Sequence, residues 1–172
     1  MMQRVISFTL LILVINASCN SSSGKRNADK TDISSTAQES FLLVTKVVDG
    51  DTFWADDGTR SGLKIRLIGV DAPESRKTFK KEVGYFGKEA KTYLTNLLSG
   101  KRVRLEYDLN RTDQFGRTLA YVYLQDGTFV NAELVKNGFA MTMTVPPNVK
   151  FADLFVKLEI EARENNRGLW KK

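Results

Sequence analysis

Four carboxylates flank strand-like segments near the start of the globular part of the chain. The stretch VVDGDTFW holds Asp49 and Asp51 on either side of a glycine, and RLIGVDAPE, about twenty residues further on, holds Asp71 and Glu74. Carboxylates in such loops bind a hard cation or act as general acid and base. The same residues also make ordinary turns, since Asp-Gly is a strong hairpin signal. The spacing therefore indicates either two turns or the two halves of one site.

Two arginines accompany these carboxylates. Arg66 lies on the strand-like segment before Asp71, and Arg117 ends the loop RTDQFGR, which also contains Arg111 and Asp113. A guanidinium offers planar pairs of N–H donors that match carboxylate or phosphate oxygens. A strand arginine is often only solvated, but cations and carboxylates gathered at strand ends and loops are typical of an active site.

The composition narrows the chemistry. The 172 residues include no histidine and one cysteine, Cys19. An imidazole base, an intrachain disulfide and a zinc site of Cys and His are therefore excluded. Any bound metal needs oxygen ligands, which favours Ca2+ or Mg2+. The net charge of +6 suits a polyanionic partner, or it is a solvated basic surface.

Short strands and helices alternate through the rest of the chain. Alternating or β-rich residues predict five strands, at 41–48, 52–55, 63–68, 102–107 and 118–124. Helical spacing predicts helices near 90–97, after a cap at Asn131, and from 151. The apolar stripe of the last helix is expected to pack in the core, and it consists of Phe151, Leu154, Phe155, Leu158 and Ala162. Five strands with interleaved helices predict an α+β fold, a small OB-fold barrel.

The first forty residues carry targeting signals. Residues 1–18 are predicted to be a signal peptide, because the apolar run from Val5 to Ile15 is too short to span a bilayer. Cys19 just after it resembles the lipidated first residue of a bacterial lipoprotein; cleavage by ordinary signal peptidase is the alternative. Residues 19–40 are a Ser-rich tether, and 41–172 form the folded domain. The protein is thus expected to be exported, and either anchored at the cell envelope or secreted.

Five segments together resemble one known family. VVDGDTF, IRLIGVDAPE and RTDQFGRTLAYVY are similar, in this order, to the signature segments of the staphylococcal nuclease-like (thermonuclease) family. LVKNGFA and NNRGLW are also similar, so the resemblance covers residues 42–170. It implies an OB-fold barrel with three helices and a Ca2+-dependent endonuclease. Such an enzyme hydrolyses DNA and RNA with little sequence preference and leaves 3′-phosphate ends, and we expect a monomer.

The resemblance also implies a metal site built from oxygen ligands. Asp51 and Asp71 would bind Ca2+ through their carboxylates and Ala72 through its backbone carbonyl. Asp49 and Thr52 would support these ligands without binding the metal directly, Thr52 through water around the ion. Two carboxylates and one carbonyl leave several calcium positions open, since Ca2+ takes roughly six to eight oxygens.

Three further residues receive catalytic roles through the resemblance. Glu74 would be the general base that activates the attacking water. Arg66 and Arg117 would hold the phosphate and stabilise the charge that develops on it. A carboxylate base suits a chain without histidine.

The substrate-binding residues depart from the family pattern. Gln114 and Phe115 stand where well-studied members have Lys-Tyr, and AMTMTVPPN lacks the two tyrosines found in the matching segment. Phe115 can stack on a base but has no hydroxyl group. The basic loop SRKTFKKE, with Lys80 and Lys81, is expected to contact nucleic acid or to be merely solvated. These changes predict a competent nuclease with weaker or different substrate preference.

Two other functions fit the same fold. One is a non-catalytic module that binds nucleic acid, and the other is a surface lipoprotein that binds anionic polymers of the envelope. The complete set of Asp51, Asp71 and Glu74 favours catalysis. Binding by either module would survive a chelator, whereas metal-dependent cleavage would not.

Overall fold

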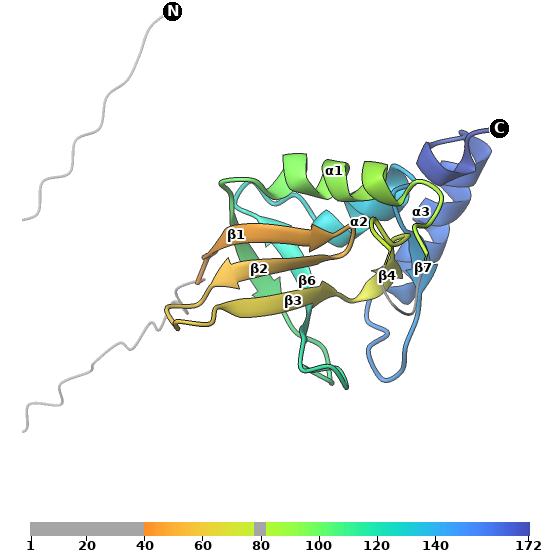
Figure 1. Cartoon of the computed structure of the whole chain (residues 1–172). Coiled ribbons are helices and arrows are strands. Elements are labelled where there is room, and N and C mark those ends of the chain that lie inside the picture. Colours follow the sequence, from red (N-terminus) through yellow and green to blue (C-terminus); the bar gives the residue numbers. More distant parts are fainter. Residues whose placement is uncertain (1–39, 78–81) are drawn as a thin grey trace, which may run out of the picture. The chain divides into compact units, whose positions relative to one another are not determined.

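The fold is an OB-type β-barrel with helices packed around it, as predicted. A computed structural model describes residues 40–77 and 82–172. Five strands close the barrel in the order β1-β2-β3-β6-β5 (Figure 1). They are β1 (Leu42–Asp49), β2 (Thr52–Asp56), β3 (Leu63–Leu67), β5 (Arg102–Glu106) and β6 (Thr118–Leu124). Apolar side chains of these strands, such as Phe53, Ile65, Val103 and Val122, fill the interior and are fully buried.

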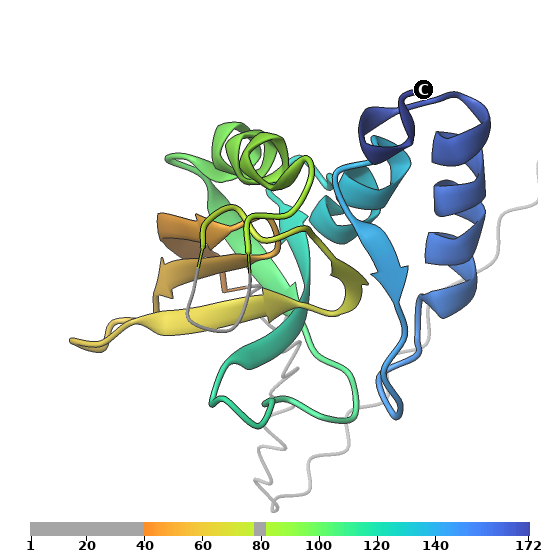
Figure 2. The ribbon, with the colours of Figure 1, turned by 45° about the vertical axis from the view of Figure 1, so that its right-hand side comes forward.

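Three helices were predicted, and residues 40–77 and 82–172 contain three α-helices. They are α1 (Gly87–Leu98), α2 (Val130–Lys136) and α3 (Ala152–Glu164), followed by a short 3₁₀ turn, η1 (Gly168–Trp170). Figure 2 shows α1 above one end of the barrel and α3 beside α2. In the part of the chain that the structure describes, no helix is long and apolar enough to cross a bilayer.

Two details of the helices correct the sequence prediction. Asn131 does not cap α2; it lies inside the helix, is fully buried, and Phe129 occupies the cap position. Its side chain accepts a hydrogen bond from the Val122 amide and donates one to the Ile68 carbonyl. The apolar stripe of α3 was predicted to pack in the core, but one of its residues, Leu154, is exposed.

A second, two-stranded sheet was not predicted. It pairs β4 (Gly69–Asp71) with β7 (Met141–Met143), and Asp71 lies opposite Met141. Glu159 of α3 accepts hydrogen bonds from the amide and hydroxyl groups of Thr142, at 2.7 and 2.6 Å. Helix α3 therefore fixes β7, and β7 fixes the strand that ends in Asp71.

Two bulges in β1 change which residues face outward. Val44 lies opposite Ala55 but Lys46 lies opposite Trp54, so Thr45 is an extra residue. A second shift brings Asp49 opposite Thr52. An extra residue bends a strand and re-aims the side chains that follow it. The bulges thus place Asp49 on the same face as Thr52, beside the carboxylates described below.

The barrel closes through one short parallel pair. β3 and β6 run parallel, with Arg66 opposite Leu119. The buried Asn131 side chain reaches between them, since it binds the carbonyl of Ile68, just past β3, and the amide of Val122 in β6. This pairing brings Arg66 close to the start of β6, where Arg117 precedes the strand.

Candidate active site

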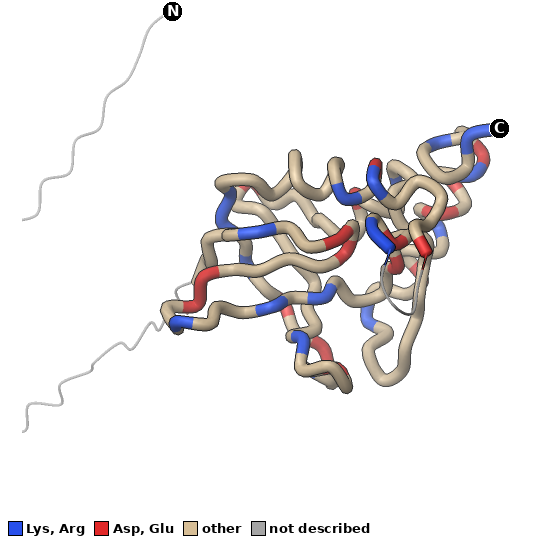
Figure 3. Tube along the Cα trace, viewed as in Figure 1, with Lys and Arg blue, Asp and Glu red and all other residues tan. Residues whose placement is uncertain are grey.

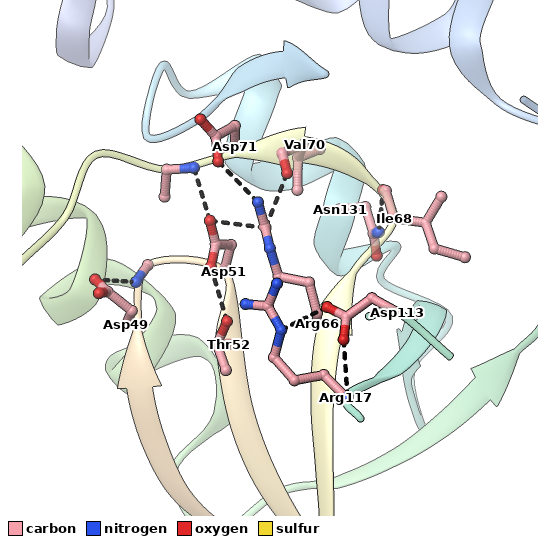
Figure 4. Close-up of polar contacts among 12 residues, drawn as sticks. Asp49, Asp51, Thr52, Arg66, Ile68, Val70, Asp71, Asp113, Arg117 and Asn131 are labelled. Carbon is pink, nitrogen blue, oxygen red and sulfur yellow. Dashed lines mark hydrogen bonds and ion pairs between the residues drawn. The ribbon is translucent and has the colours of Figure 1, made fainter. Parts of the chain in front are cut away.

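Arg66 lies between two of the predicted metal-ligating carboxylates. Its Nη1 is 2.7 Å from Asp51 Oδ2, and its Nη2 is 2.8 Å from Asp71 Oδ1. Nη1 also donates to the Val70 carbonyl at 2.9 Å (Figure 4). The Arg66 side chain is only 8% exposed and that of Asp51 10%, whereas Asp71 is 41% exposed. Arg66 alternates with the core residues Ile65 and Leu67 and so faces out of the barrel, but the carboxylates and β4 cover it.

Asp51 is the most heavily hydrogen-bonded carboxylate of the site. Besides Arg66, it accepts bonds from the Ala72 amide and the Thr52 hydroxyl, both at 2.9 Å. Burial raises the pKa of Asp51, and the nearby Asp71 also raises it, while Arg66 and the two hydrogen bonds oppose the rise. The two carboxylates are therefore close enough to repel each other, which is the situation that a cation relieves.

Asp49 joins the end of β1 to the corner around Pro73. Its Oδ1 accepts from the amides of Gly50, at 2.9 Å, and Ser75, at 3.0 Å. The turn between β1 and β2 packs tightly against the same corner, because a Cβ added at Gly50 would lie 2.6 Å from that of Ala72. Asp49 and Gly50 thus hold the segment that carries Asp71 and Ala72.

The backbone of Glu74 is held by the segment that leads into α1. The Gly84 amide donates to the Glu74 carbonyl at 2.9 Å. A Cβ at Gly87 would overlap that carbonyl oxygen, so the first residue of α1 must be a glycine for the close approach. Helix α1 therefore supports the position of Glu74 directly.

Arg117 is oriented by Asp113, four residues earlier. Its Nε donates to Asp113 Oδ2 at 2.6 Å, and its amide donates to Oδ1 at 3.0 Å. Burial pushes the pKa of Asp113 upward, but the hydrogen bonds from the Arg117 amide and side chain outweigh it and lower the pKa. The guanidinium carbon of Arg117 also lies 5.4 Å from the ring centre of Phe115. Figure 4 shows the Arg66 and Arg117 side chains reaching into the space beside Asp51.

One pocket of about 380 Å³ gathers most of the predicted residues. Seven of the eight metal and catalytic candidates line it: Asp49, Asp51, Thr52, Arg66, Asp71, Glu74 and Arg117. Ala72, the eighth candidate, is buried and does not line the pocket. The remaining lining residues are Val48, Lys64, Arg76 and Met143. No role was predicted from the sequence for Val48, Lys64 or Met143.

A second pocket, of about 270 Å³, adjoins the first through Arg66, Arg117 and Met143. Gln114 and Phe115 line one side of it, and Met143 and Val145 contribute apolar side chains. The Phe115 ring is 72% exposed. Gln114 and Phe115 thus lie beside the two arginines. The segment that lacks the family's two tyrosines contributes the apolar side chains of Met143 and Val145 to the same pocket.

The donor chemistry at Asp51, Asp71 and Ala72 fits a hard cation. Two mutually repelling carboxylates and a backbone carbonyl supply only oxygen, the ligand that Ca2+ prefers. Within residues 40–77 and 82–172, no three acidic, His or Cys side chains form a metal-binding group. A cation held by the two carboxylates would therefore complete its shell with backbone, water or substrate oxygens.

Some predicted residues fall outside the described chain. Lys80, Lys81 and Cys19, with the predicted signal peptide and nearly all of the tether, lie outside residues 40–77 and 82–172. Asp113 is the positioning residue that the sequence argument named without giving it a role. The sequence did contain a signal for this contact. Asp113 precedes Arg117 by four residues, and the glycine turn between them allows the two side chains to pair.

Comparisons with known proteins point to one family. The family described as "Staphylococcal nuclease homologue" matches residues 64–172. The chain is 37% identical to a thermonuclease of Staphylococcus intermedius over 169 residues, which cover 98% of this chain and 96% of that protein. It is 39% identical to the thermonuclease of Staphylococcus hyicus over 79% of each chain. It is 34% identical to endonuclease YncB of Bacillus subtilis over 78% of this chain and 64% of that protein.

The fold and the pocket define an OB-fold protein with an acidic and guanidinium-rich site at one end of its barrel. Together with the matched region and relatives, they identify the family. The chain belongs to the staphylococcal nuclease family.

Proposed function

We propose that the protein is a Ca2+-dependent endonuclease that hydrolyses DNA and RNA and leaves 3′-phosphate ends. The protein is a nuclease, a phosphodiester hydrolase, because it belongs to this family and is similar to thermonucleases and an endonuclease over most of its length. The proposed calcium dependence, mechanism and products are supported by one observation. Arg66 and Arg117 line the same pocket as Asp51, Asp71 and Glu74.

In this proposal Asp51, Asp71 and the Ala72 carbonyl hold the calcium ion. When bound, the ion would supply positive charge that offsets the negative charge of the phosphodiester and the negative charge that develops on the attacking water. The protein prepares the ligands through its own contacts. Thr52 and the Ala72 amide fix the carboxylate of Asp51, and Asp49 holds the corner that carries the other two ligands.

The two arginines bind the phosphate and stabilise the transition state. A guanidinium is always charged, and its planar donors match phosphate oxygens. The hydrogen bond from Arg117 to Asp113 uses Nε, so it leaves the Nη donors for the phosphate. Removing one donor of this kind typically costs about 2.7–4 kcal/mol in the transition state, or roughly 10²–10³ in kcat.

Glu74 takes the proton from the water as the oxygen attacks phosphorus. The bond from phosphorus to the 5′-oxygen then breaks, which leaves a 3′-phosphate, and the departing 5′-oxygen takes a proton from solvent water to become a 5′-hydroxyl. The geometric support is that Glu74 lines the pocket of the arginines while the α1 segment holds its backbone. Base catalysis of this type contributes roughly 10²–10⁴ in rate.

The adjoining apolar pocket is proposed to receive a base of the substrate. Phe115 offers a ring for stacking, and Gln114 offers no charge for a terminal phosphate. We expect weaker or altered substrate preference for this reason. Export, with Cys19 as a lipid anchor or with release from the cell, is proposed from the amino-terminal sequence alone.

The test is cleavage of single-stranded DNA, duplex DNA and RNA by the purified protein, with Ca2+ or with a chelator. Glu74→Gln is compared with Glu164→Gln, a matched change at an exposed residue at the end of α3. We expect calcium-dependent cleavage that falls by 10²-fold or more only in Glu74→Gln. Cleavage that survives the chelator, or equal loss in both variants, would refute the mechanism. End-labelling of the products reports whether the phosphate stays on the 3′ side.

A further inference from the structure

A basic row with an aromatic centre crosses the outer face of three barrel strands. Lys46 of β1 lies opposite Trp54 of β2, and Trp54 lies opposite Lys64 of β3. Neighbouring strands are about 4.8 Å apart, so the row spans roughly 10 Å. Trp54 alternates with the core residues Phe53 and Ala55, which places the indole on the outside of the barrel.

The bulge in β1 is what completes this row. Without the bulge, strict alternation from the buried Val44 through Thr45 would turn Lys46 toward the interior. Instead both Thr45 and Lys46 are exposed. Figure 3 shows basic positions on β1 and β3, with none on β2 between them.

The row is continuous with the catalytic pocket. Lys64 lines that pocket, and its Nζ lies 5.8 Å from the centre of the Trp54 ring. On β3, Lys64 is two residues from Arg66 on the same face, a step of about 6.6 Å. Lys64 therefore links the arginine of the active site to the indole.

On the far side of Trp54 the surface is hollowed again. A shallow pocket of about 510 Å³ is lined by Lys46, Trp54 and Arg60, together with one acidic residue among the described residues, Asp56. Asp56 accepts a hydrogen bond from the Gly58 amide within its own turn. The cations here outnumber the carboxylate, and they stand on both sides of the ring.

We propose that Lys46, Trp54, Arg60 and Lys64, here called the Trp54 strip, form a second binding subsite for a single-stranded stretch of the nucleic-acid substrate. The inference rests on the proposed function and extends the catalytic pocket by one or more nucleotides. An indole face flanked by cations offers what single strands bind, a stacking surface and partners for phosphates. A duplex hides its base faces, so the strip favours unpaired substrate.

The first test is binding, without cleavage, to a fluorescently labelled single-stranded 12-mer in the presence of chelator. Trp54→Leu keeps apolar cover but removes the ring, and we expect its affinity to fall roughly fivefold or more, while Trp54→Phe retains most of the affinity. Thermal unfolding of each variant verifies that the fold persists. Equal binding by wild type and Trp54→Leu, or equal loss in the Leu and Phe variants, overturns the proposal.

The charges are tested through the salt dependence. Lys46→Gln combined with Lys64→Gln should reduce the slope of log affinity against log salt by about 1.4, since each single-strand phosphate contact contributes about 0.7. The matched control changes Lys136 and Lys157 to Gln, which alters the charge equally on α2 and α3. The same reduction in the control would assign the effect to net charge and refute the subsite.

Substrate length links the strip to turnover. Relative to wild type, Trp54→Leu should lose kcat/KM in the presence of Ca2+ on both substrates. The loss should be at least fivefold greater for the 12-mer than for a dinucleotide. Equal losses on both substrates contradict a separate subsite. If no variant cleaves but Trp54→Leu still weakens binding, the strip stands as a binding surface and the catalytic proposal fails instead.

Discussion

Replacing Arg66 by methionine separates its structural role from its role in catalysis. The guanidinium now neutralises Asp51 and Asp71 at 2.7 and 2.8 Å. Methionine keeps much of the apolar stem but leaves two neighbouring carboxylates without their shared cation. We therefore expect the variant to be less stable without calcium, to gain more stability than wild type from calcium, and to lose activity.

The size of the effect follows from burial. Arg66 and Asp51 are about a tenth exposed, and removing one partner of a buried pair typically costs about 3–5 kcal/mol. The contact with Asp71, which is 41% exposed, adds about 0–1 kcal/mol because solvent screens it. For a domain of this size, such a loss lowers the melting temperature by roughly 10–20 °C.

Calcium should recover part of that loss. In wild type, a cation must share the carboxylates with Arg66, whereas in Arg66→Met it meets two unpaired charges. A tenfold tighter affinity adds about 1.4 kcal/mol of stabilisation at a saturating ion concentration.

The assay is thermal unfolding followed by circular dichroism, in chelator and in excess calcium, together with calcium titration. Arg111→Met serves as the control, because Arg111 stacks on Tyr107 instead. The reasoning is refuted if Arg66→Met melts like wild type in chelator, or if its calcium-induced shift is no larger than that of wild type.

Three other variants test the supports of the site. Asn131→Ala should destabilise the protein by about 2–4 kcal/mol in chemical unfolding, because the Ile68 carbonyl loses its buried partner; a loss below 1 kcal/mol would contradict this bridge. Asp113→Asn should lower kcat/KM by about 10- to 100-fold through Arg117, with little change in melting temperature, and unchanged kinetics would rule out the positioning role. Glu159 has a lowered pKa, because hydrogen bonds outweigh the burial that raises it. Its contribution to stability is thus complete above its ordinary pKa of 4.5 and is lost as the pH falls through the lower folded value. In Glu159→Gln the melting temperature should therefore fall less over this acidic range than in wild type. Melting temperatures that fall in parallel with pH in both proteins would refute this.

The residue pattern predicted the barrel and most of the constellation around the pocket. Alternation in β3 and β5 and the β-rich run of β6 are strong local signals, and the order of the motifs fits one family. The two three-residue strands, β4 and β7, were missed because three residues carry no period. Their pairing joins two segments that lie far apart in the sequence, and Glu159 of α3 supports it through Thr142.

Other features depend on tertiary contacts that no local pattern records. Asn131 was expected at a helix cap, a common place for this residue type, yet it satisfies backbone groups across the β3–β6 junction. The bulge at Thr45 has no marker in the sequence, although it decides which way Lys46 faces. The burial of Arg66 also required knowing that Asp51, Asp71 and Val70 surround it.

The parallel closure of β3 on β6 has a consequence for the order of events during folding. Arg66 and Arg117 are fifty-one positions apart in the chain, and their proximity depends on that pairing. Helices and hairpins form early because their contacts are local, whereas such distant pairings are slow. We therefore expect the pocket to be among the last parts of the molecule to be assembled. During refolding, helical circular dichroism should recover before cleavage does, and a chain still emerging from the ribosome carries the carboxylates and Arg66 without the partner strand that completes the site.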